Sequence, residues 1–397
     1  MENACARECM GNTMKISISD KGFRRILSGH PWIYRDDLTS GVECEDGDIV
    51  DVLHRENFIG RGFYSATSKI SIRIITRHDE RIDRNFWERR VLDALRMRER
   101  AIGDSDAYRL IFSEADGIPS LIIDRYGRSF SMQTLSPGAD RLKHLFAEII
   151  ADLFDPISIY ERNDAAVRQL EGLDEVKGEL FGKTPDQIDI REGSIKLRID
   201  IKTGQKTGAY LDQRENRINA ERYFSGNVLD CFTYQGAFAL HAAGKARHVT
   251  AIDSSADALR IAQENACINS MQNIHFEQAN VFDYLKMAAS GSESFDAVVL
   301  DPPAFARSRG DLKNAMRAYL EINRKAMKAI KPGGFLITSS CSYNLSEEDF
   351  ISVIRKAAAQ TRRSILIIEQ RMQAADHPFL VTFPESHYLK SFILTVI

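Results

Sequence analysis

The chain has 397 residues, of which 44% are hydrophobic and 27% charged, and its formal net charge is −3. This composition excludes wholesale disorder, and the length predicts two or three domains. No apolar run is long enough to span a membrane, and the start lacks the apolar core of a secretory signal, so we expect a cytoplasmic protein. Residues 1–13 form a polar leader with Cys5 and Cys9, which is either a tag or an upstream start. The six cysteines include no C-x2-C pair, which disfavours a zinc site and predicts no bound metal.

The first part of the chain, residues 14–82, is expected to form a small β-domain. Its strand and turn signals are alternating runs at 15–19, 48–53 and 69–76, with turns at Asp46-Gly47 and Ile59-Gly60. A helix follows over 83–100, with apolar residues on one face and arginines on the other. From Arg61 to Arg100 there are 11 Lys/Arg against 6 Asp/Glu, which fits either a solvated helix face or contact with an RNA backbone.

The middle of the chain, residues 83–195 including this linker helix, is predicted to be a small α+β domain. Its expected elements are a hairpin of 120–124 and 129–135 around Tyr126-Gly127, a helix at 140–154 and strands at 157–161 and 195–201.

Residues 196–397 alternate strand and helix patterns, which predicts an α/β domain with a doubly wound, mainly parallel sheet. The expected strands are 228–231, 249–252, 274–277, 297–300, 335–339, 365–369 and 388–395. No clear helix joins the last two strands, so an antiparallel edge is expected.

The strand at 228–231 carries an acid, Asp230, and runs through Phe232 into a tight turn with Gly236 and then a helix. The next strand ends in Asp253, at a spacing typical of an acid that binds a ribose diol. One glycine in the turn suits a nucleoside without a pyrophosphate, and S-adenosylmethionine is such a ligand. The alternative is an ordinary strand–turn–helix with an acid there by chance.

Three later strand ends add candidates. Asn280 follows the third strand and is expected to meet an adenine edge, with Asp283 as its competitor. Asp301 ends the fourth strand before Pro302 and Pro303, which stiffen the turn so that it can hold a planar base. Cys341 follows the fifth strand at the same rim of the sheet, where we expect a chemical role; the alternative is a small buried apolar residue.

The sequence resembles the bacterial class I S-adenosylmethionine-dependent methyltransferases that modify C5 of a cytosine in large-subunit (23S) ribosomal RNA. The matching runs are His30–Tyr34, Glu114–Pro119, Lys206–Arg214, Leu229–Phe238, Asp301–Pro303, Ser339–Ser342 and Gln373–Pro378. The resemblance covers nearly the whole chain from Met14. It implies an N-terminal PUA domain, a C-terminal Rossmann-like fold with a seven-stranded sheet, S-adenosylmethionine as cofactor, ribosomal RNA as partner, and a homodimer. Such enzymes often carry an aspartate where this chain has Asn280, and an amide can meet the same adenine edge.

The resemblance implies a covalent mechanism in which the Cys341 thiolate attacks C6 of cytosine and thereby activates C5. Asp301 is expected to bind the N3/N4 edge of the base and stabilise the charge that forms. Two-cysteine relatives place a second thiol at the position of Pro303, so no second thiol assists release here, and the base that removes the C5 proton is not identified.

The run from Lys206 to Arg217 is either a solvated loop and helix start or part of the site. In the second interpretation, Tyr210, Gln213 and Arg214 contact the cofactor, and Arg214 pairs with its methionine carboxylate. The RNA contacts are then Lys206, Pro302, Pro303 and Trp32. Trp32 either stacks on a base or packs in the core.

Two other functions fit parts of the sequence. Asp301-Pro302-Pro303 could hold an exocyclic amine for N-methylation of a base, although Ala304 intervenes before the aromatic Phe305 that usually follows such prolines. A non-catalytic RNA-binding or ribosome-assembly protein that retains a cofactor fold is the second alternative.

Overall fold

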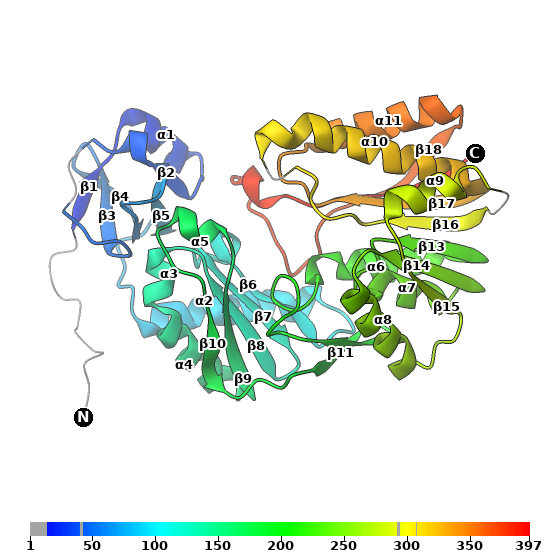
Figure 1. Ribbon diagram of the computed structural model, residues 1–397. Coiled ribbons are helices and arrows are strands. Elements are labelled where there is room, and N and C mark those ends of the chain that lie inside the picture. Colours follow the sequence, from blue (N-terminus) through cyan, green and yellow to red (C-terminus); the bar gives the residue numbers. More distant parts are fainter. Residues whose placement is uncertain (1–13, 40–42, 292–293, 307) are drawn as a thin grey trace. The chain divides into compact units, whose positions relative to one another are not determined.

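The computed structural model describes residues 14–39, 43–291, 294–306 and 308–397 (Figure 1). The leader with Cys5 and Cys9 lies outside these residues. The chain divides into two units. Among the described residues, the first unit holds those from 14 to 99 together with 109–185 and 379–384, and the second unit holds 100–108, 186–378 and 385–397. The N-terminal and central regions, predicted as separate domains, therefore belong to one unit.

The N-terminal part of the first unit is a β-rich fold, as expected. Its elements are β1 (Lys15–Ser17), α1 (Asp20–Leu27), β2 (Trp32–Tyr34), β3 (Ile49–His54), β4 (Asn57–Tyr64) and β5 (Ile70–Thr76). The strands form a sheet in the order β1-β3-β4-β5-β2. Ile16, Ile33, Val50 and Ile72 are at most 1% exposed, so the alternating apolar residues of these strands make its core.

The turn predicted at Ile59-Gly60 is wrong, because both residues lie inside β4. The chain reverses earlier, at Arg55-Glu56, where both residues have positive φ angles of 49° and 64°. Such a two-residue turn normally carries Asn or Gly, so its usual sequence signal is missing here. Gly60 serves a different purpose: a Cβ atom there would come within 2.9 Å of the Thr76 carbonyl oxygen on β5.

A second sheet, which lies in the first unit except for residues 107 and 108 of β6, has the order β10-β9-β8-β7-β6. Its strands are β6 (Ala107–Phe112), β7 (Leu121–Tyr126), β8 (Ser129–Thr134), β9 (Ser158–Asn163) and β10 (Val176–Gly182), and its helices are α2 (Arg84–Ala101), α3 (Pro137–Arg141), α4 (Lys143–Phe154) and α5 (Val167–Leu170). The hairpin of β7 and β8 is confirmed. The buried ring of Trp87 on α2 stacks on Phe63 at 5.9 Å and meets Phe146 of α4 at 5.4 Å. Through these rings, α2 joins the two parts of the unit.

Several arginines of the basic run are structural, which corrects the expectation of one arginine face on the helix. Arg98 of α2 is fully buried and forms a bidentate ion pair with Asp116. Arg73 is 4% exposed and donates to Glu171 at 2.7 Å. Arg77, Arg81 and Arg89, in contrast, are exposed. The excess of Lys and Arg over Asp and Glu between Arg61 and Arg100 therefore does not all lie on the surface, because some of these arginines are buried in ion pairs.

The second unit contains the predicted α/β fold. Its main sheet has the order β15-β14-β13-β16-β17-β19-β18. The strands are β13 (Asn227–Cys231), β14 (His248–Asp253), β15 (Ile274–Gln278), β16 (Phe295–Leu300), β17 (Ile330–Ser340), β18 (Ile365–Arg371) and β19 (Lys390–Val396). β13 to β17 are parallel, and β19 runs antiparallel between β17 and β18. The antiparallel strand is thus not the edge strand, which is β18.

Helices cover both faces of this sheet (Figure 1). They are α6 (Arg214–Ala220), α7 (Ala237–Ala243), α8 (Ala256–Ile268), α9 (Val281–Ala288), α10 (Leu312–Ala329) and α11 (Glu347–Thr361). Residues of α9, α10 and α11 form one apolar core with the sheet, and residues of α6 and α7 form another. This arrangement leaves the carboxyl ends of the parallel strands for a ligand.

A hairpin of β11 (Ile188–Glu192) and β12 (Ile195–Ile199) precedes the main sheet and belongs to the second unit. Apart from residues 100–108, that unit therefore starts at Asp186, earlier than the boundary expected at residue 196. Within the described ranges, no helix is both long and apolar enough to cross a bilayer.

Candidate functional site

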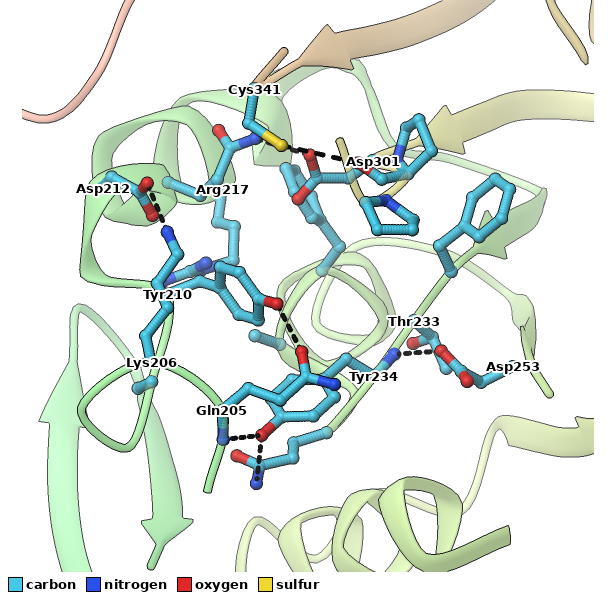
Figure 2. Close-up of a pocket in the computed structure, with 18 of the residues that line it drawn as sticks. Gln205, Lys206, Tyr210, Asp212, Arg217, Thr233, Tyr234, Asp253, Asp301 and Cys341 are labelled. Atoms are coloured by element: carbon cyan, nitrogen blue, oxygen red, sulfur yellow. Dashed lines mark hydrogen bonds and ion pairs between the residues drawn. The ribbon is translucent and has the colours of Figure 1, made fainter. Parts of the chain in front are cut away.

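A cavity of about 520 Å³ opens where β13, β14, β16 and β17 end (Figure 2). Its size suits a small-molecule ligand. The predicted site residues that line it are Lys206, Tyr210, Gln213, Phe232, Asp253, Asp301, Pro302, Pro303 and Cys341. The cavity is not lined by the remaining residues that were predicted to bind the cofactor, which are Asp230, Gly236, Asn280, Asp283 and Arg214. The strand ends thus bring together residues far apart in the sequence.

The loop after β13 is held in an unusual backbone conformation. Phe232 and Tyr234 have φ angles of 63° and 51°, and Gly236 has 83°. Residues other than glycine rarely adopt such angles, and each costs on the order of 1–3 kcal/mol. A backbone hydrogen bond from Thr233 to the Ile252 carbonyl, at 3.0 Å, ties the loop to β14. A Cβ atom on Gly236 would lie 3.0 Å from the Cβ of Ala262, so this position favours glycine.

Asp230 lies behind this loop. Its Oδ2 accepts a hydrogen bond from the Thr233 hydroxyl at 2.5 Å, and its Oδ1 is buried with no hydrogen-bond partner among the described residues. Burial, with the nearby charge of Asp301, raises the pKa of Asp230 to about 7. Asp230 therefore supports the loop conformation from behind the cavity wall.

Asp253 is positioned by two backbone amides. Its Oδ2 accepts from the Tyr234 amide at 2.9 Å, and its Oδ1 accepts from the Ser255 amide at 2.9 Å. The carboxylate is half-buried and lines the cavity, so lone pairs remain for two hydroxyl donors.

Asn280 is instead the N-cap of α9. Its side-chain oxygen accepts from the amides of Phe282, at 2.9 Å, and Asp283, at 3.4 Å. This is a common use of asparagine at a helix start.

Asp301 and Cys341 occupy the ends of neighbouring strands. Cys341 is half-buried, and its Sγ lies 3.8 Å from the carbonyl oxygen of Pro302. The Gln213 amide donates to Asp301 Oδ1 at 2.7 Å, and Gln213 in turn accepts from Asn216 at 2.6 Å. This chain of amides fixes the Asp301 carboxyl group beside the sulfur.

The electrostatics of this pair favour uncharged forms. Burial, together with the charge of Asp212, raises the pKa of Asp301 to about 6. Burial and the charge of Asp301 raise the pKa of the Cys341 thiol to about 11, against the opposing effect of Lys206. At neutral pH the thiol therefore holds its proton until a reaction removes it.

Lys206 reaches the cavity from the loop before α6. Its Nζ pairs with Asp212 Oδ2 at 2.6 Å and lies 4.3 Å from the centre of the Tyr210 ring. The Tyr388 hydroxyl donates to the same oxygen at 2.7 Å. Although burial opposes it, the positive charge of Lys206 and the hydrogen bond from Tyr388 lower the pKa of Asp212. The ion pair thus holds a cation at the cavity wall.

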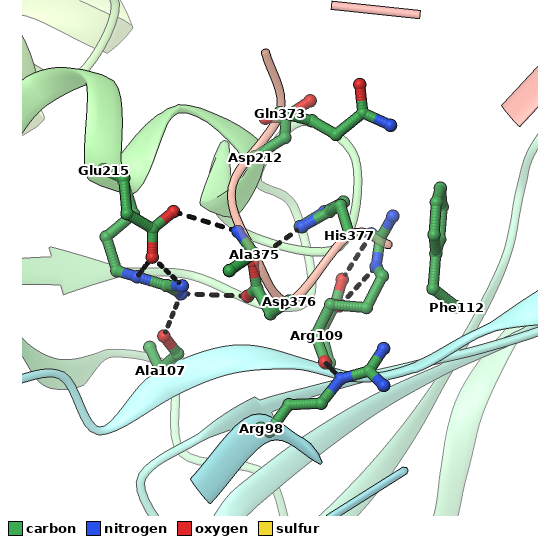
Figure 3. A network of polar contacts seen from close by, with 12 residues as sticks. Arg98, Ala107, Arg109, Phe112, Asp212, Glu215, Gln373, Ala375, Asp376 and His377 are labelled. Atoms are coloured by element: carbon green, nitrogen blue, oxygen red, sulfur yellow. Dashed lines mark hydrogen bonds and ion pairs between the residues drawn. The ribbon is translucent and has the colours of Figure 1, made fainter. Parts of the chain in front are cut away.

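Arg214 points away from the cavity and is 1% exposed. Its guanidinium pairs with Asp376 at 2.9 Å and with Glu215 at 2.6 Å, and it donates to the Ala107 carbonyl (Figure 3). This network joins α6 to the segment before β19. The ion pairs satisfy the guanidinium without a ligand, and we assign Arg214 a structural role.

We expect Asp376→Ala to lower the free energy of unfolding by about 3–5 kcal/mol, because it removes one partner of a buried charge. Urea denaturation followed by circular dichroism measures this loss. The control is Glu264→Ala, which removes an exposed pair with Arg260 and is expected to change the stability by less than about 1 kcal/mol. Equal stabilities of the two variants would contradict a structural role for the Arg214–Asp376 pair.

Arg217, one turn later on α6, lines the cavity and was missed by sequence reasoning. It is held by a bidentate pair with Glu192 of β11, at 2.5 and 2.7 Å. Glu192 also contacts the buried His241, whose other ring nitrogen faces Glu221. Spacing alone could not favour Arg217 over Arg214, because the carboxylates that orient them come from distant parts of the chain.

Trp32 belongs to the first unit. Its indole Nε1 donates to Glu114 at 2.9 Å, and its ring meets the edge of Phe383 at 4.5 Å. Trp32 therefore has the packing partners of a structural residue, and base stacking stays a prediction.

Comparison with known proteins assigns both parts of the chain. Residues 16–77 match a PUA-like domain and residues 225–379 match a methyltransferase domain. Ribosomal RNA large subunit methyltransferase I of Shewanella denitrificans is 39% identical over 394 residues, covering 96% of this chain and 99% of the relative. The chain belongs to the ribosomal RNA large subunit methyltransferase I family. The enzyme of the same name from Klebsiella pneumoniae is 39% identical over 387 residues, 94% of this chain and 96% of the relative.

Solved structures support the fold. A protein from Streptococcus mutans described as a SAM-dependent methyltransferase aligns with a TM-score of 0.82 at 21% identity, over 97% of this chain and all of that one. A methyltransferase complexed with SAH aligns with a TM-score of 0.83 over the same shares, also at 21% identity. The expected PUA-like domain followed by a Rossmann-like methyltransferase fold is thereby confirmed.

Proposed function

We propose that this protein forms 5-methylcytosine in large-subunit ribosomal RNA, through a covalent bond between Cys341 and C6 of the target cytosine. One observation carries the proposal: Asp301 and Cys341, at the ends of neighbouring strands, line the same cavity. A carboxyl group that binds a base edge and a thiol that attacks its ring are the two groups that this chemistry requires.

S-adenosylmethionine is the cofactor of this family, and the cavity fits it. The paired oxygens of Asp253 suit a ribose diol, and Phe232 and Tyr234 supply apolar walls. The buried Oδ1 of Asp230, which lacks a partner among the described residues, lies behind the same loop. Arg217 takes the position at the cavity wall that was predicted for Arg214. When bound, the cofactor supplies an electrophilic methyl group.

The residues of the chain then prepare the base. Cys341 adds to C6, and its S–H proton passes to the Asp301 carboxylate as the S–C bond forms. The electrons of the C5–C6 double bond form a C4–C5 double bond and those of the C4–N3 double bond move onto N3, so that C5 becomes an enamine-like nucleophile. Asp301 accepts a hydrogen bond from the N4 amino group and delivers a proton to N3, which neutralises the developing negative charge. Once C5 carries the methyl group, a base removes the C5 proton, the thiolate leaves, and N3 returns its proton to Asp301, which restores the aromatic ring.

The target base must leave its stack before the sulfur can reach C6, and this is least costly in single-stranded or disrupted RNA. The PUA-like domain, with exposed arginines such as Arg77, Arg81 and Arg89 in the same unit, is suited to hold the RNA backbone.

N-methylation of a base is the weaker candidate. Such enzymes present an aromatic ring directly after the prolines. Here Phe305 does not line the cavity, and its ring packs against the buried Tyr319 at 4.8 Å and against Phe282 at 6.0 Å. The aromatic residue therefore belongs to the core and not to the base site.

The test is product analysis. The protein is incubated with tritiated S-adenosylmethionine and total ribosomal RNA from a strain that lacks the enzyme, both as free RNA and as ribosomal particles. We expect labelled 5-methylcytidine from the large-subunit RNA after digestion to nucleosides. Labelled N4-methylcytidine would overturn the proposal in favour of N-methylation, and transfer to no RNA would favour a binding protein.

A further inference from the structure

A buried lysine lies beside the thiol and has no role in the mechanism above. Lys390 is the first residue of β19 and is paired with Ser340 of β17, the residue before Cys341. It is only 4% exposed. Its Nζ donates to the carbonyl oxygens of Ser342, at 2.7 Å, and Tyr388, at 2.8 Å. Lys390 therefore contacts the chain on both sides of Cys341.

Hydroxyl groups complete this support. The Tyr319 hydroxyl lies 2.9 Å from the Ser340 hydroxyl and 3.0 Å from the Ser342 hydroxyl. The Ser342 hydroxyl also accepts from the Ala306 amide at 3.3 Å. Burying a lysine and three hydroxyl groups is costly, and the hydrogen bonds among them offset part of that cost. The polar cluster thus holds the turn that presents the sulfur.

The groups around the thiol carry opposing charges. Asp301 and Asp212 disfavour a thiolate at Cys341, and Lys206 favours one. Lys390 interacts electrostatically with Cys341 and with Glu347. Burial lowers the pKa of Lys390 to about 8, so the amine is mainly protonated at pH 7. Lys390 thus supplies a positive charge on the protein side of a thiol that burial and two carboxylates otherwise keep neutral.

We propose that Lys390 is a positioning residue for Cys341, which holds the turn of residues 340–342 and stabilises the thiolate through its positive charge. The inference relies on the proposed function only in taking Cys341 as the nucleophile.

The two roles of Lys390, the charge effect on the thiol and the support of the turn, depend differently on pH. Below about pH 8 the amine is charged and assists loss of the S–H proton. Above it the amine is neutral, yet it still has hydrogens to donate to the two carbonyl oxygens. The charge effect therefore disappears at high pH, whereas the support of the turn does not.

Alkylation of Cys341 by iodoacetamide tests this in the full-length protein without cofactor or RNA. The thiolate displaces iodide, the thiol proton goes to the buffer, and mass spectrometry of the Cys341 peptide gives the rate. At pH 7 we expect Lys390→Met to react about tenfold more slowly than the wild type, which corresponds to a lost charge interaction of about 1.4 kcal/mol with the thiolate. The two rates should converge above pH 9. A ratio of one at pH 7, or a ratio that is the same at every pH, would overturn the role of the charge.

Lys325→Met is the matched control. Lys325 of α10 is also buried, at 7% exposure, and its Nζ donates to the Phe282 carbonyl at 2.8 Å, but it does not contact the Cys341 turn. We expect this variant to alkylate at the wild-type rate at every pH. A slowing equal to that of Lys390→Met would mean that any buried lysine in this unit has the same effect.

If Lys390→Met does not fold, the wild type alone still tests the inference. Its logarithmic alkylation rate should rise with pH at a slope below one between about pH 7.5 and 9, because Lys390 loses its charge there. A straight line of unit slope through this range would refute the inference. The assay involves no methyl transfer, so a failure to form 5-methylcytosine would refute the proposed function while leaving the effect of Lys390 intact.

Discussion

Replacement of Cys341 by alanine is expected to abolish methyl transfer and to leave the affinity for S-adenosylmethionine nearly unchanged. Without the sulfur no bond to C6 forms, and C5 of cytosine is too weak a nucleophile to react. The rate should fall by about 10⁴-fold or more, the order observed when the nucleophile of a covalent enzyme is removed. Single-turnover transfer to ribosomal RNA and calorimetric titration of the cofactor measure the two quantities.

Cys267→Ala is the control for Cys341→Ala, because Cys267 lies exposed on α8 and is expected to have no effect on transfer. Transfer at the wild-type rate by Cys341→Ala would refute the covalent mechanism and support N-methylation. RNA that carries 5-fluorocytosine should also trap a covalent complex with the wild type, since fluorine at C5 cannot leave as a proton. Cys341→Ala should form no such complex.

Replacement of Asp301 by asparagine is expected to slow transfer by about 10²- to 10⁴-fold, the usual contribution of a positioned acid or base. An amide can still bind the base edge, but it cannot deliver a proton to N3. Cofactor affinity should be retained, because Asp253 and not Asp301 is expected to bind the ribose. Asp257→Asn, at an exposed position in the first turn of α8, is the control and should behave as the wild type.

The pH profile gives Asp301→Asn a second readout. The active state has one proton shared between Asp301, whose raised pKa is about 6, and the Cys341 thiol, whose raised pKa is about 11. Below pH 6 both groups are protonated, so kcat/KM of the wild type should fall as the pH decreases through 6. In Asp301→Asn this acidic limb should vanish. Its persistence at the same pH would assign it to another group.

Local patterns were sufficient to predict much of the second unit. Each strand expected after residue 227 is present, because a short apolar or alternating run between polar turns favours a strand both in the buried centre and at the exposed edges of the sheet. Motifs at strand ends were informative for the same reason: Asp253, Asp301 and Cys341 follow strands whose carboxyl ends meet at one edge of the sheet. The turn at Arg55-Glu56 was missed because left-handed residues other than glycine or asparagine carry no local signal.

The sequence by itself determined the class of fold, the order of the strands along the chain and the strand ends that form the cavity, since these depend on periodicities within a few residues. The tertiary structure alone decided which polar side chains face that cavity. Arg214 and Arg217 lie on one helix, and each turns toward its carboxylate: Asp376 lies 162 residues from Arg214, and Glu192 lies 25 residues from Arg217. The position of Lys390 next to the Cys341 turn likewise depends on the pairing of β19 with β17. A buried charged side chain points toward the opposite charge that pairs with it. When the two residues are distant in sequence, only the folded structure shows which residues form the pair.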